Sequence, residues 1–239
     1  NQYPKATYAA MISYLDDQVG ELVSVLKQTG QYENTIIIFT SDNGPSYVKP
    51  LDLNYFESTS FLNNDPQRVK GKVYEGGIRV PAAIWWPGKI DQDKSANFIT
   101  MIDILPTIID LVDYRNEINV DGNSQANILM NTGDSQKTKY AVIDVTNNVL
   151  SLVDMPYKLI SSNGEYELFN IIDDPTETTN IAEIYPDLVV KYSQDLSNLP
   201  RGENRSLPLP EILRDPDLFG GKEDRIPWVE KAFVNAETK

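Results

Sequence analysis

The sequence predicts an α/β fold, in which an incomplete α/β/α sandwich is followed by a small antiparallel sheet with a packed helix. Two observations lead to this prediction. In the first half, an amphipathic helical pattern precedes a short polar loop and an unbroken apolar run, as in one unit of a sandwich. In the second half, short apolar segments alternate with turn residues, which is typical of an antiparallel sheet. The predicted divisions are residues 1–135, 136–199 and an irregular tail, 200–239.

A helix is predicted over residues 6–28, because apolar side chains recur there at spacings of three and four residues. Gly30 follows the last turn, where a glycine commonly ends a helix. The adjacent Asp16 and Asp17 point about 100° apart on a helix, so we interpret them as solvated surface and not as a catalytic pair. The apolar line comprises Tyr8, Ile12, Leu15, Val19, Leu22 and Leu26.

The segment 35–45 reads Thr-Ile-Ile-Ile-Phe-Thr-Ser-Asp-Asn-Gly-Pro. Its apolar half has no polar alternation, which suits a strand covered on both faces. Polar side chains follow the carboxyl end of that strand, where ligands bind in open α/β sheets. Asp42 and Asn43 offer the oxygen donors that Ca²⁺ or Mg²⁺ prefers. The alternative is a hairpin turn, which Asn-Gly also favours.

Two loops of unusual composition follow. Residues 46–67 form a long loop with several aromatic residues, which we interpret as an ordered wall near a site or as a loop anchored to the core. Residues 68–81 read Arg-Val-Lys-Gly-Lys-Val-Tyr-Glu-Gly-Gly-Ile-Arg-Val-Pro, with four basic residues against one glutamate. Ammonium groups among glycines suit an anion-binding loop, and a glycine turn with solvated lysines is the alternative.

Further elements complete the predicted fold. A buried strand over 82–88 ends in Pro-Gly, and a helix over 98–112 is bent or started by Pro106. Its predicted inner face is Met101, Ile102, Leu105, Ile108, Ile109 and Val112.

The second half contains four predicted strands and a helix. The strands span residues 140–145, 149–153, 157–161 and 167–171, with turns at Asn147-Asn148, Met155-Pro156 and Asn163-Gly164. Asp173 and Asp174 offer carboxylates to a cation, but Asp-Asp-Pro is more typical of a turn. A helix is predicted over 185–198, with Leu188, Val189, Tyr192 and Leu196 facing inward.

Composition excludes several function classes. The formal net charge is −14, so binding to nucleic acid or to an anionic membrane surface is not expected. No apolar run is long enough to cross a membrane. The chain has no cysteine and no histidine, which excludes disulfides, the usual zinc sites and a histidine-based catalytic triad within it.

The order of motifs resembles the C-terminal half of the sulfatase family, in the alkaline-phosphatase-like superfamily. Six motifs carry the resemblance, over about 170 residues, and residues 200–239 are not covered by it. They are Tyr-Ala-Ala-Met-Ile-Ser-Tyr-Leu-Asp-Asp-Gln-Val-Gly at 8–20, Asn-Thr-Ile-Ile-Ile-Phe-Thr-Ser-Asp-Asn-Gly at 34–44, Lys-Gly-Lys-Val-Tyr-Glu-Gly-Gly-Ile-Arg-Val-Pro at 70–81, Trp-Trp-Pro-Gly at 85–88, Asp-Ile-Leu-Pro-Thr at 103–107, and Glu-Leu-Phe-Asn with Asp-Pro-Thr-Glu-Thr-Thr-Asn between 167 and 180.

The resemblance implies a site. Asp42 and Asn43 match two ligands of a divalent cation, usually Ca²⁺ and alternatively Mg²⁺, that lies under the sulfate ester. Lys70 matches the lysine that contacts the sulfate. Glu75, Gly76 and Gly77 are expected to shape the turn, and Arg79 is expected in a structural ion pair.

Other family features are missing from these residues. The family nucleophile, a formylglycine made from Cys/Ser-x-Pro/Ala-x-Arg, has no counterpart here, and the N-terminal aspartate ligands and active-site histidines are also absent. We therefore expect a fragment of a sulfatase that is inactive alone, acts on aryl or carbohydrate sulfates when complete, and is exported. The alternatives are a phosphate or phosphonate ester hydrolase and a non-catalytic protein that binds a sulfated ligand.

Overall fold

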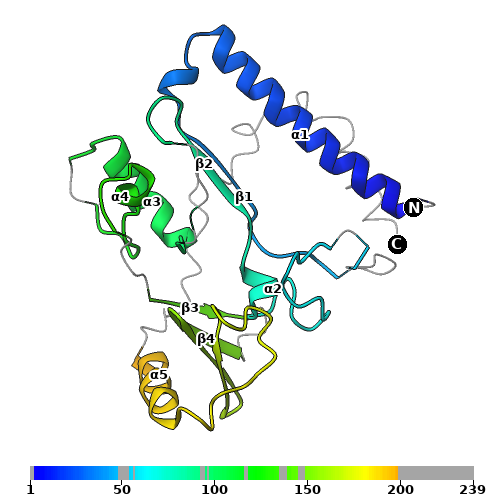
Figure 1. The fold of residues 1–239 in the computed structure, drawn as a ribbon, viewed down its shortest axis with the longest axis vertical. Coiled ribbons are helices and arrows are strands. Elements are labelled where there is room, and N and C mark those ends of the chain that lie inside the picture. The colour runs from blue at the N-terminus through cyan, green and yellow to red at the C-terminus, as the bar shows by residue number, and fades with distance from the viewer. Residues whose placement is uncertain are drawn as a thin grey trace, which may run out of the picture. The chain divides into compact units, whose positions relative to one another are not determined.

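The computed structural model describes residues 3–47, 54–55, 57–91, 95, 97–115, 118–134, 139–144 and 149–198 (Figure 1). The chain divides into a compact unit of residues 1–198 and a second unit of residues 199–239. All described residues belong to the first unit. The predicted tail over 200–239, the predicted turn at Asn147-Asn148 and the division near residue 135 lie outside the described residues, so they stay predictions.

Helix α1 spans Pro4–Gln28 and confirms the first predicted helix. A proline occupies its first turn, where the missing N–H would have no partner within the helix. Gly30, with a φ of 70°, follows its C-terminal end, as predicted. None of the helix residues is buried, and Ile12 and Leu22 are 50% and 53% exposed. The described residues therefore leave the apolar line of α1 largely uncovered.

Strands β1, Ile37–Thr40, and β2, Ala82–Trp85, form a two-stranded antiparallel ribbon. The short 3₁₀ helix η1, Tyr32–Asn34, precedes β1. The sequence predicts that β1 is covered on both faces, but Ile37 is its one buried residue and Phe39 is 40% exposed. The prediction of burial is wrong for both strands, since β2 has no buried residue either; among the described residues, β1 and β2 pair with each other alone and no larger sheet surrounds them.

Helix α3, Met101–Leu111, includes Pro106 as predicted, but it buries a different face. Its buried residues are Asp103, Pro106 and Thr107, whereas Met101 and Leu105 of the predicted inner face are exposed. Asp103 accepts hydrogen bonds from the backbone of Thr100 at 2.9 Å and of Asn123 at 2.8 Å. The Asp103 side chain thus links α3 by a hydrogen bond to the segment before helix α4, Ala126–Leu129.

The second half forms a four-stranded antiparallel meander in the order β3-β4-β5-β6, and this confirms the predicted sheet. Asn163 and Gly164 both have positive φ values, which the tight turn between β5 and β6 requires. The strands are β3, Tyr140–Ile143; β4, Val149–Asp154; β5, Tyr157–Ser162; and β6, Glu165–Asn170.

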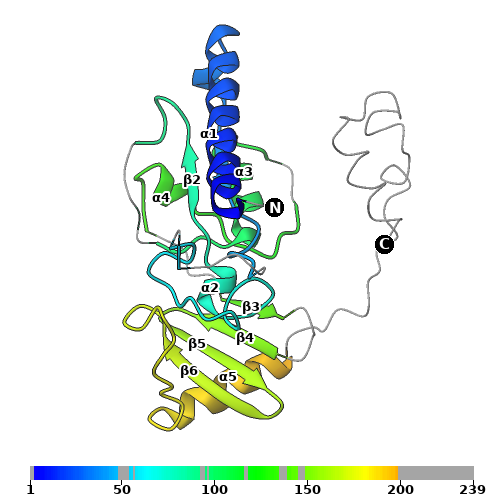
Figure 2. The ribbon, with the colours of Figure 1, turned by 90° about the vertical axis from the view of Figure 1, so that its right-hand side faces the viewer.

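The sheet is covered on both faces. Helix α5, Pro186–Asn198, runs along one face (Figure 2), and its Tyr192 and Leu196 are buried there, as predicted. Side chains that alternate with these along the strands pack instead against Val73 and Tyr74. On the α5 face lie Leu152, Leu159 and Leu168, and on the opposite face lie Val153, Ile160 and Phe169.

Candidate functional site

The polar segment that follows β1 folds into a compact loop. The Ser41 hydroxyl donates a hydrogen bond to the Asn43 carbonyl at 2.9 Å. The side-chain amide nitrogen of Asn43, Nδ2, donates a hydrogen bond to the Gly44 carbonyl, also at 2.9 Å. Its side-chain carbonyl is therefore the atom suited to accept a cation. Asp42 is exposed and Asn43 is half-buried, so both can contact a ligand.

Residues 68–79, called the basic loop below, lie against this strand end. The Gly44 amide donates to the Gly77 carbonyl at 2.8 Å, and the Lys70 amide donates to the Pro45 carbonyl at 3.1 Å. A Cβ on Gly44 would lie 1.9 Å from the Gly76 carbonyl oxygen, so a larger residue would force the two segments apart. The structure thus joins the two predicted site segments through their backbones.

The basic loop turns back on itself through close backbone contacts. A Cβ on Gly76 would lie 2.7 Å from the Arg68 carbonyl oxygen, and one on Gly77 would lie 2.5 Å from that of Lys72. Both glycines are needed for this approach, which agrees with their predicted role in shaping the turn. Lys70 is exposed and Lys72 is half-buried.

Arg79 makes the predicted structural ion pair. Its guanidinium lies 3.7 Å from a carboxylate oxygen of Glu75, the first residue of helix α2, Glu75–Ile78. It also lies over the rings of Phe61 and Phe98, at 5.1 and 4.7 Å from their centroids. Phe61 belongs to the aromatic loop of residues 46–67, which at this point packs against the basic loop.

A buried ionic cluster behind the basic loop was not predicted. The Lys158 ammonium lies 3.0 Å from Glu75 and 2.8 Å from Glu177, and all three side chains are at most 1% exposed. Burial raises the pKa of Glu177, while the Lys158 charge opposes that shift. One signal was present in the sequence: Lys158 lies two residues before Ile160 in a predicted strand, so both side chains are on the same face of β5.

Tyr74 adds a second contact between the basic loop and the sheet. Its hydroxyl donates to the Glu167 carboxylate at 2.6 Å. Burial, together with this hydrogen bond, raises the pKa of Tyr74 well above its usual range. The phenol therefore stays protonated at neutral pH and keeps donating.

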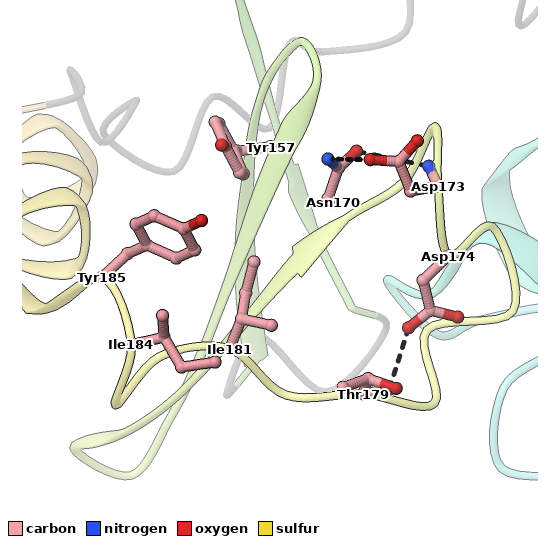
Figure 3. A pocket seen from close by; sticks show the side chains of 8 residues that line it. All are labelled: Tyr157, Asn170, Asp173, Asp174, Thr179, Ile181, Ile184 and Tyr185. Carbon is pink, nitrogen blue, oxygen red and sulfur yellow. Dashed lines mark hydrogen bonds between the residues drawn. The ribbon is translucent and has the colours of Figure 1, made fainter.

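Asp173 and Asp174 lie at the edge of a cavity of about 290 Å³ between β5, β6 and the following loop (Figure 3). The Asp174 carboxylate accepts hydrogen bonds from Thr176, Thr178 and Thr179. Burial alone would raise its pKa, but these hydrogen bonds outweigh that effect and lower it. Asp173 accepts from Asn170 at 2.6 Å. Both carboxylates thus organise the predicted turn.

The donors at the β1 end fit part of a site for a hard divalent cation. One carboxylate and one amide carbonyl are suitable oxygen ligands, but such cations bind six or more. Within the described part of the chain, no three His, Cys, Asp or Glu side chains gather so that they could hold a metal ion. Asp42 and Asn43 would therefore need partners from other residues.

In the described residues, no helix is long and apolar enough to span a membrane.

The chain is similar to known proteins in both sequence and structure. The sulfatase family model matches residues 2–114, and the model of the N-sulphoglucosamine sulphohydrolase C-terminal region matches residues 68–200. The chain is 28% identical over 214 residues to an N-acetylgalactosamine-6-O-sulfatase of Bacteroides thetaiotaomicron. The matched region covers 81% of this chain and 42% of that protein. The chain thus spans about two fifths of the length of this relative.

Solved structures agree with the sequence matches. Ps i-CgsB in complex with k-i-k-neocarrahexaose has 27% identity and a TM-score of 0.66, over 80% of this chain and 42% of that one. The phosphonate monoester hydrolase of Agrobacterium radiobacter has 22% identity and a TM-score of 0.55, over 81% of this chain and 40% of that one, which shows a shared fold alone. The predicted α/β fold is confirmed, and the chain belongs to the sulfatase family, of which it covers the C-terminal part.

Proposed function

We propose that this chain supplies part of the active site of a sulfuric ester hydrolase. Asp42 and Asn43 act as two ligands of Ca²⁺, with Mg²⁺ as the alternative, and Lys70 contacts the sulfate group. The observation that carries the proposal is the pair of backbone hydrogen bonds that joins Gly44 to Gly77 and Lys70 to Pro45. These bonds bring the oxygen donors and the basic loop into one region.

The proposed residues have complementary roles. Asp42 contributes a negative charge and Asn43 a neutral carbonyl; Asp42 is exposed and Asn43 is half-buried, which leaves both in reach of a ligand. A bound cation would supply Lewis-acid stabilisation of the sulfate oxygens. The Lys70 amide is bonded to Pro45, two residues after Asn43, and its exposed ammonium can bind an oxyanion. Together these groups favour the negative charge that develops on sulfuryl oxygens.

We propose that the nucleophile and the remaining metal ligands come from residues outside these 239. The sequence contains no cysteine and no Ser-x-Pro-x-Arg segment, so it offers no precursor of a formylglycine. The curated relative named above is more than twice as long as the part that matches. On this proposal the chain by itself has no hydrolase activity.

The proposed substrate class is a sulfated carbohydrate or an aryl sulfate. The named relative is an N-acetylgalactosamine-6-O-sulfatase, and the similar structure of Ps i-CgsB contains a neocarrahexaose. The basic loop and the match to two sulfatase models favour a sulfate ester over the phosphate or phosphonate alternative. Export remains an expectation from the family resemblance.

The close approach at Gly44 gives a first test, which needs no catalysis. Gly44→Ala should lower the free energy of unfolding by about 1–3 kcal/mol, because the new methyl group overlaps the Gly76 carbonyl. Gly20→Ala is the matched control: in the described part of the chain, apart from its own turn of helix, no atom lies within 4 Å of the position of the new Cβ, and alanine favours a helix interior by up to about 1 kcal/mol. Urea denaturation of the chain measures both. Unchanged stability of Gly44→Ala would contradict the backbone contact.

The metal ligands are tested in the full-length protein. Asp42→Ala and Asn43→Ala should each abolish Ca²⁺-dependent hydrolysis of p-nitrophenyl sulfate, because each removes an oxygen donor. The control is Asp16→Ala, which removes an exposed carboxylate from α1 and should leave turnover at the wild-type level. Chelation followed by titration with Ca²⁺ or Mg²⁺ identifies the ion. Wild-type turnover in both ligand variants would refute the metal assignment.

The role of Lys70 is tested against its neighbour. Lys70→Ala should lower turnover of sulfate esters by about 10²–10³-fold, because a charged contact to the reacting group is lost. Lys72→Ala keeps the same loop and removes a lysine of no proposed role, so its turnover should stay close to wild type. Steady-state kinetics on both variants decide the matter. A mild effect at Lys70 with a large loss at Lys72 would transfer the sulfate contact to Lys72.

The proposal of an external nucleophile has its own experiment. The isolated 239-residue chain should release no p-nitrophenol from p-nitrophenyl sulfate above the buffer rate, with or without Ca²⁺, because these residues contain no formylglycine precursor. The assay needs a folded sample, which near-ultraviolet circular dichroism establishes. Saturable turnover by the folded chain would overturn this part of the proposal.

A further inference from the structure

The buried ionic cluster joins three segments that are far apart in the sequence. Lys158 lies on β5, Glu75 begins α2 in the basic loop, and Glu177 belongs to the loop after β6. The Lys158 side chain is 0% exposed and those of the two glutamates are 1% exposed. Because an unpaired buried charge is strongly unfavourable, all three segments must stay together for the cluster to be satisfied.

The cluster also holds both ends of the basic loop. Near its C-terminal end, a Glu177 carboxylate oxygen accepts a hydrogen bond from the Glu75 amide at 2.7 Å. At its N-terminal end, the Arg68 guanidinium donates to the Glu177 carbonyl at 2.6 Å. Arg79, 3.7 Å from Glu75, brings a second positive charge that balances the two carboxylates. Lys70 lies between these anchored ends.

A short chain of contacts leads from the cluster to the proposed metal ligands. The Arg79 amide donates to the Glu75 carbonyl at 2.7 Å, and the Gly77 amide donates to the Tyr74 carbonyl at 2.8 Å. The Gly77 carbonyl then accepts from Gly44, the residue after Asn43. Movement of Glu75 would thus be transmitted to both proposed site segments.

We infer that Lys158 is a positioning residue, through which the C-terminal sheet holds Lys70 in place beside Asp42 and Asn43. Lys158 does so through Glu75 and Glu177, without touching a ligand itself. The catalytic part of this inference rests on the proposed function, whereas the mechanical part does not. On this inference, the four-stranded sheet β3–β6 keeps the basic loop, and with it Lys70, in position.

Amide hydrogen exchange of the chain tests the mechanical part. Lys158→Met should speed exchange at the Gly44 and Lys70 amides by about tenfold or more, while the Leu159 amide in the middle of the sheet keeps its protection, because the loop opens locally. Lys158→Arg retains the charge and should restore part of the loop protection. A purely global role would instead speed exchange at Leu159 to the same extent as at the loop, and this result would overturn the inference.

A matched control is available on the same sheet. Lys139 also forms ion pairs with two carboxylates, Asp154 and Asp195, but at the surface, with 37% of its side chain exposed. Lys139→Met should therefore leave exchange in the basic loop unchanged. Loop exchange that rises equally in Lys139→Met and Lys158→Met would overturn the inference.

A second variant covers the case in which Lys158→Met fails to fold. The triple variant Glu75→Gln, Lys158→Met, Glu177→Gln removes all three buried charges, and the charge that loses its partner is that of Arg79, whose side chain is 33% exposed. Its sheet should stay protected while the loop amides exchange about tenfold faster than in wild type. Wild-type protection of the loop would show that packing alone positions it, against the inference.

Kinetics of the full-length protein test the catalytic part. Lys158→Met, or the triple variant, should lower kcat for p-nitrophenyl sulfate by about tenfold or more. A misplaced charged group stabilises the transition state less, and this loss is larger than the loss of substrate binding. KM should change less than kcat. A full wild-type kcat with an opened loop would refute the catalytic part. If Lys70→Ala is itself without effect, the proposed function fails, and the exchange experiment still decides the mechanical part.

Discussion

The buried pairing of Lys158 with Glu75 and Glu177 is the interaction on which the rest of the structure depends. Three charges are removed from water, which is costly unless each finds its partner. Their partners come from a strand, a short helix and a loop, separated by 83 and 102 positions in the sequence. The native arrangement of these segments pairs all three charges.

The double-sided sheet explains why such a cluster can exist. Its strands bury apolar side chains on alternate faces, one against α5 and the other against the basic loop. Lys158 and Glu167 lie on the face of the sheet that contacts the basic loop, the same face as Ile160 and Phe169. Water is excluded from the Lys158 cluster, whose three side chains are at most 1% exposed, and this makes its ion pairs electrostatically stronger than at a surface. The basic loop is thereby covered by the sheet along one side, while Lys70 stays exposed to solvent.

Membership of the sulfatase family fits this arrangement. The family motifs lie far apart in the sequence, yet the strand end, the basic loop and the loop of Glu177 are in contact here. Two of the motif residues turned out to have structural roles: Asp103 fastens α3 by accepting backbone hydrogen bonds, and Asp174 organises a turn. The residues left exposed at the loop contact, Asp42 and Lys70 among them, are those for which a binding role is proposed.

The sequence by itself determined the longer elements, their order and the family, whereas the short helices η1, α2 and α4 were not predicted. Helix α1, the four strands of the second sheet and α5 follow from local periodicity and turn residues, which act over a few positions. The family followed from motifs, and with it the proposed ligands. The tertiary structure alone decided which faces are covered: among the described residues, Ile12 and Leu22 of α1 and Met101 and Leu105 of α3 stay exposed, while Asp103 and Lys158 are buried. Burial of a charge depends on partners many positions away, and local patterns carry no information about those partners until the chain has folded.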